Sequence, residues 1–415
     1  MSRKGIDPKR VAVYALGWPK HLLWHGYPPW TRPMIIGLVL WAVFVALEVV
    51  DIRLPAVVRS VSALLIGLLI LRTACDALIT AAERIAARKL WDHYVAATLA
   101  EMLSTLPELV AICFVIAVSP EAALTIALVT IYNNALVFSV YSYFLPKNHQ
   151  GRYLMPRAVT EAGSQLLIAG AGLGSVIGFV MLVLLGTEAD KQTFSVPDLV
   201  MLSVVMLAIF GVYLTVLIRG YASEEEAVRQ ALELTSAEVE QRRSEVYEEV
   251  TKTSVGNILL VLVLGIAAAF MGGERVSVFA QTAIGELSIN PIATAVLLAA
   301  FAGMSEYVIL WRAHRKGQHR IALANAFGGI TQVMFLVLPF TLLAIAMFQV
   351  AIGAAHAELP LAFSHSTLLL FLLLFPTFFV LLELIQEDHT LGALDTTIMA
   401  AIFVVIITLL LTYGG

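Results

Sequence analysis

Two glutamates lie within apolar stretches of the sequence, where charged side chains are rare. Glu108 ends the run Ser-Thr-Leu-Pro-Glu, and Glu306 ends the run Gly-Met-Ser-Glu. An ionised carboxylate is costly to bury in an apolar medium, so such a side chain normally faces a partner, a cavity or an ion. For either residue taken alone, a protonated glutamate that makes a structural hydrogen bond is the alternative.

Each glutamate is followed by a pair of polar residues at the same distance. The pair Asn133-Asn134 follows Glu108, and the pair Thr331-Gln332 follows Glu306. In both cases the second member of the pair stands 26 positions after its glutamate. The matched spacing indicates an internal repeat, and it predicts that the glutamates and the polar pairs gather at one site.

The gathered side chains would offer carboxylate, amide and hydroxyl oxygens. Hard cations such as Ca²⁺ prefer oxygen ligands, and two negative charges match a divalent ion. Without a cation the two carboxylates would repel each other, so protons compete with the metal for the same oxygens. The residues that we expect to line this site are Glu108, Glu306, Asn134, Gln332, Thr331, Thr105, Asn133 and Ser305.

The composition places the surrounding chain in a membrane. Of its 415 residues, 60% are hydrophobic and 13% are charged, and the mean hydropathy is +0.87. Soluble proteins average roughly 45–50% apolar and about 25% charged residues, so lipid must be the solvent for much of this chain. The net charge of −4, without a long basic tract, gives no sign of nucleic-acid binding.

The apolar segments predict an all-α membrane protein with about eleven transmembrane helices. A bilayer core about 30 Å thick needs roughly 20 residues of α-helix. Stretches that meet this need fall near residues 33–50, 56–82, 93–118, 121–145, 159–186, 197–219, 254–272, 289–312, 319–349, 364–386 and 391–412.

These segments group into two halves of five helices, preceded by an extra helix. We expect a cytoplasmic N-terminal segment at 1–32, the extra first helix at 33–55, a first five-helix repeat at 56–219 and a second at 253–415. Because five is odd, the second half enters the membrane from the opposite side. Inverted repeats of this kind place their substrate site near the bilayer midplane.

Between the halves, residues 220–252 form a predicted acidic cytoplasmic linker helix. Residues 223–250 hold nine glutamates, and Ser223 stands three positions before Glu226, which predicts a helix start. Apolar residues recur along one face of this segment. The helix is either a solvated connector or a cation-sensing element, and the sequence leaves both open.

The basic residues predict the orientation. With the N-terminus in the cytoplasm, 21 of the 26 lysines and arginines fall on the cytoplasmic side, which basic residues favour. Arg53, Arg59, Lys191 and Arg275 fall outside, and Arg72 falls within a span. We therefore expect a cytoplasmic N-terminus and an external C-terminus, and the short termini favour a bacterial inner membrane.

At these residues the sequence resembles the Ca²⁺/cation antiporter superfamily. The run 104–109 (STLPEL) is similar to the TSLPEL element of its sodium/calcium exchanger branch. Residues 287–306 and 331–340, the extra first helix and the acidic linker helix are more similar to the cation/proton exchanger branch. The resemblance implies a secondary active antiporter with no permanently bound cofactor, whose two glutamates bind the transported cation, Ca²⁺ above all, and protons in turn.

The chain departs from this family at two glycine-rich elements. Residues 132–138 (YNNALVF) replace the family's Gly-Asn-x-x-Gly-Ser-Asn, and residues 328–331 (GGIT) lack the usual serines. Fewer hydroxyl ligands leave the identity of the ion open. A sodium-coupled or monovalent cation/proton exchanger of the same fold is therefore the alternative.

Three further acids are possible proton relays. Glu101 stands seven residues before Glu108, on the same helix face, and it is either a relay or a structural partner of a neighbouring helix. Asp76 stands four residues after Arg72, a spacing that allows an ion pair, so it serves either neutralisation or a proton path. Glu83 lies at the inner end of that helix. The resemblance implies a glutamate at this place, and a solvated helix end explains the charged residue equally well.

Two other classes of protein fit less well. No His-Glu-x-x-His, Gly-x-Ser-x-Gly or paired-aspartate pattern occurs in the predicted spans, which argues against an intramembrane enzyme. A non-transporting scaffold or receptor has no reason to keep matched buried carboxylates. The expected partners are membrane lipid and inorganic cations, and the sequence predicts no particular oligomeric state.

Overall fold

The fold is seen in a computed structural model that describes residues 28–52, 54–89, 93–149, 151–155, 157–186, 193–231, 254–315, 319–353, 361–362, 364–386 and 390–413. The helices up to residue 231 are α2 (Thr31–Val49), α3 (Ala56–Arg88), α4 (His93–Ser104), α5 (Leu106–Ile116), α6 (Pro120–Ser142), α7 (Arg157–Gly186) and α8 (Val196–Ala231). Those from residue 254 onward are α10 (Val255–Gly285), α11 (Pro291–Ala302), α12 (Met304–Arg315), α13 (His319–Gln332), the π-helical turn η2 (Val333–Val337), α14 (Leu338–Gly353), α15 (His365–Gln386) and α16 (Ala393–Tyr413).

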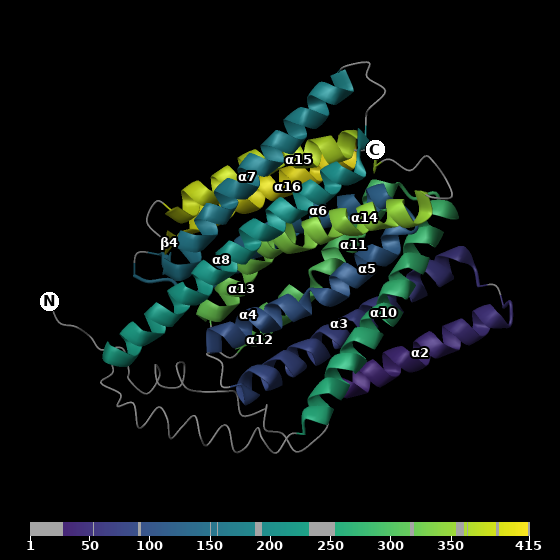
Figure 1. Cartoon of the computed structure of the whole chain (residues 1–415), viewed down its shortest axis with the longest axis horizontal. Coiled ribbons are helices and arrows are strands. Elements are labelled where there is room, and N and C mark those ends of the chain that lie inside the picture. Colours follow the sequence, from purple (N-terminus) through teal and green to yellow (C-terminus); the bar gives the residue numbers. More distant parts are fainter. Residues whose placement is uncertain are drawn as a thin grey trace.

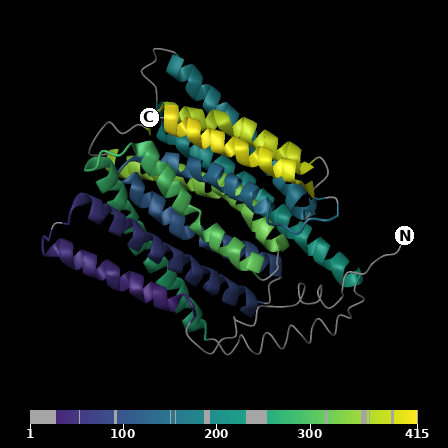
Figure 2. The ribbon, with the colours of Figure 1, turned by 180° about the vertical axis from the view of Figure 1, so that it is seen from behind.

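The helices form a tilted bundle with three parts (Figure 1). At one edge α3 and α10 pack along each other, and α2 lies outside them. At the other edge α7 packs against α15. The view from behind shows the same order, with the broken helices α4–α5 and α11–α12 and the helices α6 and α13 between the two edges (Figure 2).

The predicted fold class is confirmed: the chain is an all-α, multi-pass membrane protein. Ten of the described helices are long and apolar enough to cross a membrane. The eleventh predicted span, near residues 289–312, is present as the two short helices α11 and α12.

Two short strand pairs join the halves of the chain. β1 (Tyr153–Leu154) pairs antiparallel with β4 (Thr390–Leu391), and β2 (Thr193–Phe194) pairs antiparallel with β3 (Leu361–Ala362). In the predicted repeat β1 corresponds to β3, and β2 corresponds to β4. Exchanging the two halves therefore turns one pair into the other, as a two-fold relation between the halves requires.

The prediction for the first helix of the second half was wrong at its outer end. The predicted span ended at residue 272, whereas α10 continues to Gly285 and includes Arg275, which we had placed outside. The Arg275 guanidinium donates hydrogen bonds to Glu48 of α2 at 2.9 Å and to Glu274 at 2.6 Å. These carboxylates neutralise the arginine, so the helix can continue through Glu274 and Arg275. In the sequence, two adjacent charged residues are typical of a loop.

The boundary of the predicted linker also differs. α8 continues without a break to Ala231, so the first residues of the range 220–252 extend the last helix of the first half. Residues 232–253, which hold most of the predicted acidic helix, lie outside the described residues, as do residues 1–27.

Candidate functional site

The first predicted glutamate follows a break in its helix. We expected one helix over residues 93–118, and the structure divides it into α4 and α5 at Thr105. Pro107 has no backbone N–H for the helical ladder, which explains the break. The Thr105 hydroxyl donates a hydrogen bond to the Met102 carbonyl at 2.8 Å. As a result, Glu108 is the third residue of α5.

The second glutamate follows a break at the equivalent place. The predicted helix 289–312 is divided into α11 and α12 at Gly303, and Glu306 is the third residue of α12. A helix N-terminus carries a partial positive charge and unpaired backbone N–H groups. The two glutamates thus occupy the same position in two half-helices, a setting that favours negative charge in both.

The polar pair of the first half meets the glutamate of the second. The Asn134 amide donates a hydrogen bond to the Gly329 carbonyl at 3.1 Å. A Cβ atom at Gly329 would lie 3.1 Å from Asn134 Nδ2 and 3.2 Å from Glu306 Cγ, and one at Gly303 would lie 2.9 Å from Asn134 Oδ1. The two glycines therefore allow Asn134 and Glu306 to lie side by side against α13.

The two glutamates are buried and lie close enough to interact electrostatically. Glu108 is 5% exposed and Glu306 is 3% exposed. Within the described part of the chain, neither carboxylate oxygen of Glu108 has a hydrogen-bond partner. Buried carboxylates in such an arrangement are costly unless a cation or protons join them.

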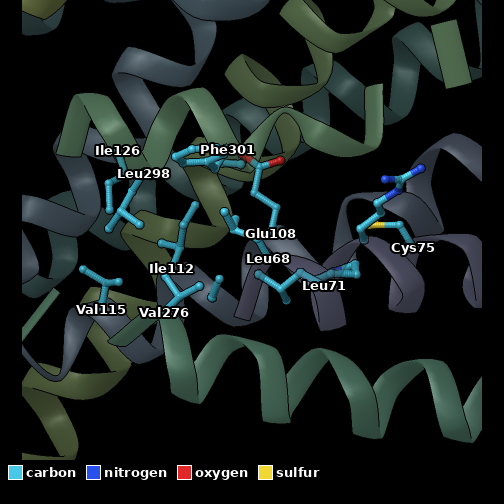
Figure 3. Close-up of a pocket in the computed structure, with 14 residues that line it drawn as sticks. Leu68, Leu71, Cys75, Glu108, Ile112, Val115, Ile126, Val276, Leu298 and Phe301 are labelled. Atoms are coloured by element: carbon cyan, nitrogen blue, oxygen red, sulfur yellow. The ribbon is translucent and has the colours of Figure 1, made fainter. Parts of the chain in front are cut away.

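A cavity of about 40 Å³ opens beside Glu108 (Figure 3). By volume it can hold a few water molecules, which need at least about 10–15 Å³ each. Its wall comes from α3, α5, α6, α10 and α11 and is mostly apolar, with Glu108, Arg72 and Cys75 as the polar members. Glu306 does not line it, so this cavity reaches one of the two glutamates.

The polar pair of the second half is also buried. The side-chain oxygen of Gln332 has no hydrogen-bond partner among the described residues, and the same holds for Asn134 Oδ1. The Thr331 hydroxyl donates to the Gly328 carbonyl at 3.0 Å. The side chain of Ser305 lies outside the described residues.

Four buried oxygens of the predicted site thus have free acceptor capacity: Glu108 Oε1 and Oε2, Asn134 Oδ1 and Gln332 Oε1. The amide members stand at equivalent positions of the two halves. Carboxylate and amide oxygens are ligands for hard cations.

Asn133 fastens α6 to the broken helix of the second half. Its side-chain amide donates hydrogen bonds to the Tyr307 hydroxyl and to the Ala299 carbonyl, the latter at 3.4 Å. The sequence analysis did not predict Tyr307 as a contact of the site. Its position directly after Glu306 could have indicated it.

A widened turn follows Thr331 and Gln332. The turn η2 is π-helical, and all five of its residues are buried. Pro339, two residues after it, lacks a backbone N–H, and its ring would collide with the carbonyl four residues earlier in a regular helix. π turns of this kind are frequent at functional sites.

Of the three predicted relay acids, Glu101 is brought into electrostatic interaction with Glu306. Asp76 is buried in α3, where its backbone carbonyl accepts a hydrogen bond from the Thr80 hydroxyl at 2.7 Å. Glu83, also in α3, is half-buried. Arg72, whose spacing from Asp76 allows an ion pair, lines the cavity beside Glu108.

Within the described residues, no three histidine, cysteine, aspartate or glutamate side chains converge as a closed metal site.

Comparison with known proteins points to one family. Residues 254–412, the second predicted repeat, match the model of the family described as sodium/calcium exchanger protein. No curated protein matches the chain significantly. The solved structure of the H⁺/Ca²⁺ exchanger CAX is similar in fold, with a TM-score of 0.62 and 13% identity over 93% of this chain and 90% of that one.

Native YfkE, described elsewhere as a Ca²⁺/H⁺ antiporter, is similar with a TM-score of 0.56 and 14% identity over 90% of this chain and 98% of that one. The family match supports the resemblance to the Ca²⁺/cation antiporter superfamily over residues 254–412, and the two solved structures share the fold of this chain.

Proposed function

We propose that this membrane protein, which has the cation antiporter fold of the Ca²⁺/H⁺ and Na⁺/Ca²⁺ exchanger type, exchanges a divalent cation such as Ca²⁺ for protons. Glu108 and Glu306 hold the cation and, in its absence, protons. The observation that carries the proposal is the set of four buried oxygens without hydrogen-bond partners, contributed by Glu108, Asn134 and Gln332 in the described structure.

The charge balance favours a divalent ion. Two ionised carboxylates carry two negative charges, so a bound Ca²⁺ leaves the buried site neutral, and two protons do the same. Asn134 and Gln332 complete the ligand shell, and Thr331, Thr105, Asn133 and Ser305 position the shell or its water. Because the ligands include few fixed charges, the ion can leave as well as bind.

Protons and the cation compete for the same oxygens. Lowering the pH protonates the two glutamates and therefore weakens cation binding, whereas raising the pH strengthens it. An empty, doubly charged site is the costly state in a membrane. The site therefore changes sides loaded with the cation or with protons, which couples the two fluxes.

We also propose two inverted repeats, at residues 56–219 and 253–415, after an extra helix at 33–55. The exchange of the strand pairs between the halves supports this division. With the N-terminus in the cytoplasm of a bacterial cell and the C-terminus outside, the cavity beside Glu108 lies in the external half of the membrane.

The second candidate is a sodium-coupled exchanger of the same fold. The family model that matches residues 254–412 is the sodium/calcium exchanger model, which favours it. Sodium would then replace protons on the same carboxylates.

Transport by the purified protein in proteoliposomes distinguishes the two. A pH gradient is imposed, Ca²⁺, Mg²⁺, Mn²⁺, Na⁺ and K⁺ are offered in turn, and the internal pH is followed. We expect Ca²⁺ to dissipate the gradient with the wild type but not with Glu306→Gln or Glu108→Gln. If no cation dissipates it while a Na⁺ gradient drives Ca²⁺ uptake, the coupling ion is sodium. If Glu306→Gln transports as the wild type does, the two-glutamate site is wrong.

A further inference from the structure

Two histidines and a tyrosine meet where the helices α6, α12 and α13 come together. The Tyr141 hydroxyl and His314 Nδ1 lie 3.2 Å apart and share a hydrogen bond. The rings of His314 and His319 meet edge to face, with their centroids 5.0 Å apart. Tyr141 is 5% exposed, and both histidines are half-buried. These three residues, which we call the histidine cluster, join one side chain from each of the three helices.

The histidine cluster lies at the far end of α12 and α13 from the candidate cation site. Glu306 is near the start of α12, and His314 follows eight positions later, about 12 Å along the helix axis. On α13 the order is reversed, with His319 at the start and Gln332 at the end. The cluster is therefore separate from the residues that we propose as ligands.

The cavity beside Glu108 lies toward the other end of α6. Ile126 of α6 lines that cavity, and Tyr141 follows 15 positions later, about 22 Å along the helix axis. The candidate site thus has a cavity toward one end of the bundle. At the opposite end, the histidine cluster fastens α6, α12 and α13 to one another.

Neutral imidazoles suit this packing better than charged ones. A neutral imidazole has one N–H and one acceptor nitrogen, whereas the protonated ring has two N–H donors. His319 Nδ1 is buried and has no hydrogen-bond partner within the described residues. A proton there would leave a charged donor unpaired, and it would face a second positive charge if His314 were protonated as well.

His314 differs from His319 in this respect. The Tyr141 hydroxyl, which bonds His314 Nδ1, can accept a hydrogen bond from that nitrogen once it is protonated. The packed cluster therefore tolerates a proton on His314 and resists the second proton, on His319.

The surrounding charges do not offset the protonated imidazoles by direct pairing. Near this end, the packed elements and their flanking residues bring Tyr143, Lys147, Arg315, Glu83, Arg84, Arg88, Tyr153, Glu161, Glu383 and Asp395. Of these groups, Tyr153 interacts electrostatically with Tyr141. Within the described part of the chain, no carboxylate forms an ion pair with either histidine.

We propose that the histidine cluster is a pH-sensitive latch. With neutral imidazoles it holds α6, α12 and α13 together at the end opposite the cavity, and with both imidazoles protonated it releases them. Histidine is ordinarily neutral above about pH 6.5 and charged below it, so the latch is closed at higher pH and opens as the pH falls.

The latch gives the proposed exchanger a second response to acid. The basic residues predict that this end faces the cytoplasm, so acid in the cytoplasm would open a path from that side toward the glutamates. This response is separate from the competition between protons and the cation at the site itself. The consequence for transport rests on the proposed function, whereas the latch itself does not.

A buried reporter cysteine beside the cluster tests the latch directly. Ala313, next to His314, is 6% exposed, so the thiol of Ala313→Cys should react slowly with N-ethylmaleimide while the latch is closed. The purified, Ca²⁺-free protein in detergent is labelled at about pH 8 and about pH 5, the range over which histidine changes charge. Mass spectrometry of the peptide that contains residue 313 separates this thiol from Cys75 and Cys113. Each rate is divided by that of glutathione at the same pH.

We expect the normalised rate to rise at least about tenfold from the higher to the lower pH. His319→Gln in the reporter protein removes the second charge and should reduce the rise to less than about twofold. His319→Lys carries its charge at both pH values and should be labelled rapidly at both. His149→Gln, at an exposed histidine that follows α6, is the matched control and keeps the full rise.

The outcomes separate the latch from the cation site. A rise of less than about twofold with both histidines present, or an undiminished rise in His319→Gln, overturns the latch. The rise should persist in Glu306→Gln, and its loss there would assign the response to the glutamates instead. Ser142→Cys, at a buried residue beside Tyr141, is the second reporter if Ala313→Cys does not fold. A protein that keeps the response but does not transport Ca²⁺ would contradict the proposed function alone.

Discussion

Two groups of buried charges in this protein differ in how their charges are balanced. Between α2 and α10, Arg275 is 2% exposed and donates four hydrogen bonds, at 2.6–3.1 Å, to Glu48 and Glu274. Trp41 donates a fifth, to Glu274, at 3.1 Å. At the centre of the bundle, Glu108, Glu306 and Glu101 lie together, and Glu101 Oε1 and both oxygens of Glu108 have no hydrogen-bond partner within the described residues.

The difference separates buried charges that are paired within the protein from acids that the proposed function assigns to a ligand. The Arg275 group contains its own counter-charges, so its bonds fasten the extra helix α2 to α10. In the central group, both carboxylate oxygens of Glu108 and Glu101 Oε1 have no hydrogen-bond partner among the described residues, and under the proposed function a cation or protons supply the balance. Burial alone therefore does not identify a functional acid, and burial without a partner is the observation on which the proposed site rests.

The largest expected effect is loss of exchange on neutralising a central glutamate. Glu108→Gln or Glu306→Gln removes one of the two charges that hold the cation, which costs about 3 kcal/mol or more and lowers Ca²⁺ transport at least about 100-fold. The thermal unfolding temperature of Glu108→Gln in detergent should stay equal or rise, because neither carboxylate oxygen of Glu108 has a hydrogen-bond partner among the described residues. A large drop in this temperature would show that the acid is structural.

Next in size is the loss of stability on breaking the compensated group. Arg275→Met leaves Glu48 and Glu274 without their counter-charge, and we expect the free energy of unfolding to fall by about 3 kcal/mol, the lower end of the range for buried pairs because both glutamates are partly exposed. Denaturant titration in detergent measures it. Adding Glu48→Gln and Glu274→Gln to the variant should recover most of the loss. An unchanged stability of Arg275→Met would mean that α2 is held by apolar packing alone.

A smaller effect separates the two neighbouring asparagines of α6. Asn134→Ala removes an amide oxygen that has no hydrogen-bond partner among the described residues, so the Ca²⁺ concentration for half-maximal binding should rise about tenfold, or about 1.4 kcal/mol. Asn133→Ala instead removes bonds to Tyr307 and Ala299 and should lower the unfolding temperature, with a smaller loss of Ca²⁺ affinity than in Asn134→Ala. Calcium titration and thermal unfolding of both variants check this, and equal effects on affinity would place both amides in the ligand shell.

The smallest effect is expected at an ion pair near the surface. Arg59 of α3 pairs with Glu286 directly after α10, and their side chains are 30% and 52% exposed. Because solvent screens such pairs, Glu286→Gln should change the free energy of unfolding by less than about 1 kcal/mol. The same denaturant titration measures this change. If Glu286→Gln lowered the free energy of unfolding as much as Arg275→Met does, the exposed ion pair would stabilise the fold as strongly as the buried Arg275 group.

Much of the central site could be predicted from the sequence because its signals are local. Glu108 and Glu306 stand out by charge in apolar surroundings, and their matched distances to Asn134 and Gln332 need only counting along the chain. The helix breaks had local signals too, in Pro107 and Gly303, but we expected continuous helices there. A proline near the first turn of a helix is compatible with a start as well as with an interruption, so only the packed structure decides.

Other features have no local signal. Arg275 was expected to follow the end of its helix because its counter-charge Glu48 is 227 positions away along the chain. Nothing near Gly328 in the sequence indicated that this glycine leaves room for the Glu101 carboxyl, since that space exists only where α4 meets α13. The cavity that reaches Glu108 but not Glu306 depends on the packing of five helices.

The sequence by itself determined that this chain is helical and belongs in lipid, and it predicted two acids at matched positions as its costly centre. These properties follow from composition and spacing, since hydrocarbon penalises every exposed polar group wherever it lies. Only the tertiary structure decided which buried charges are compensated and which are open to a ligand, because compensation depends on contacts between residues far apart along the chain.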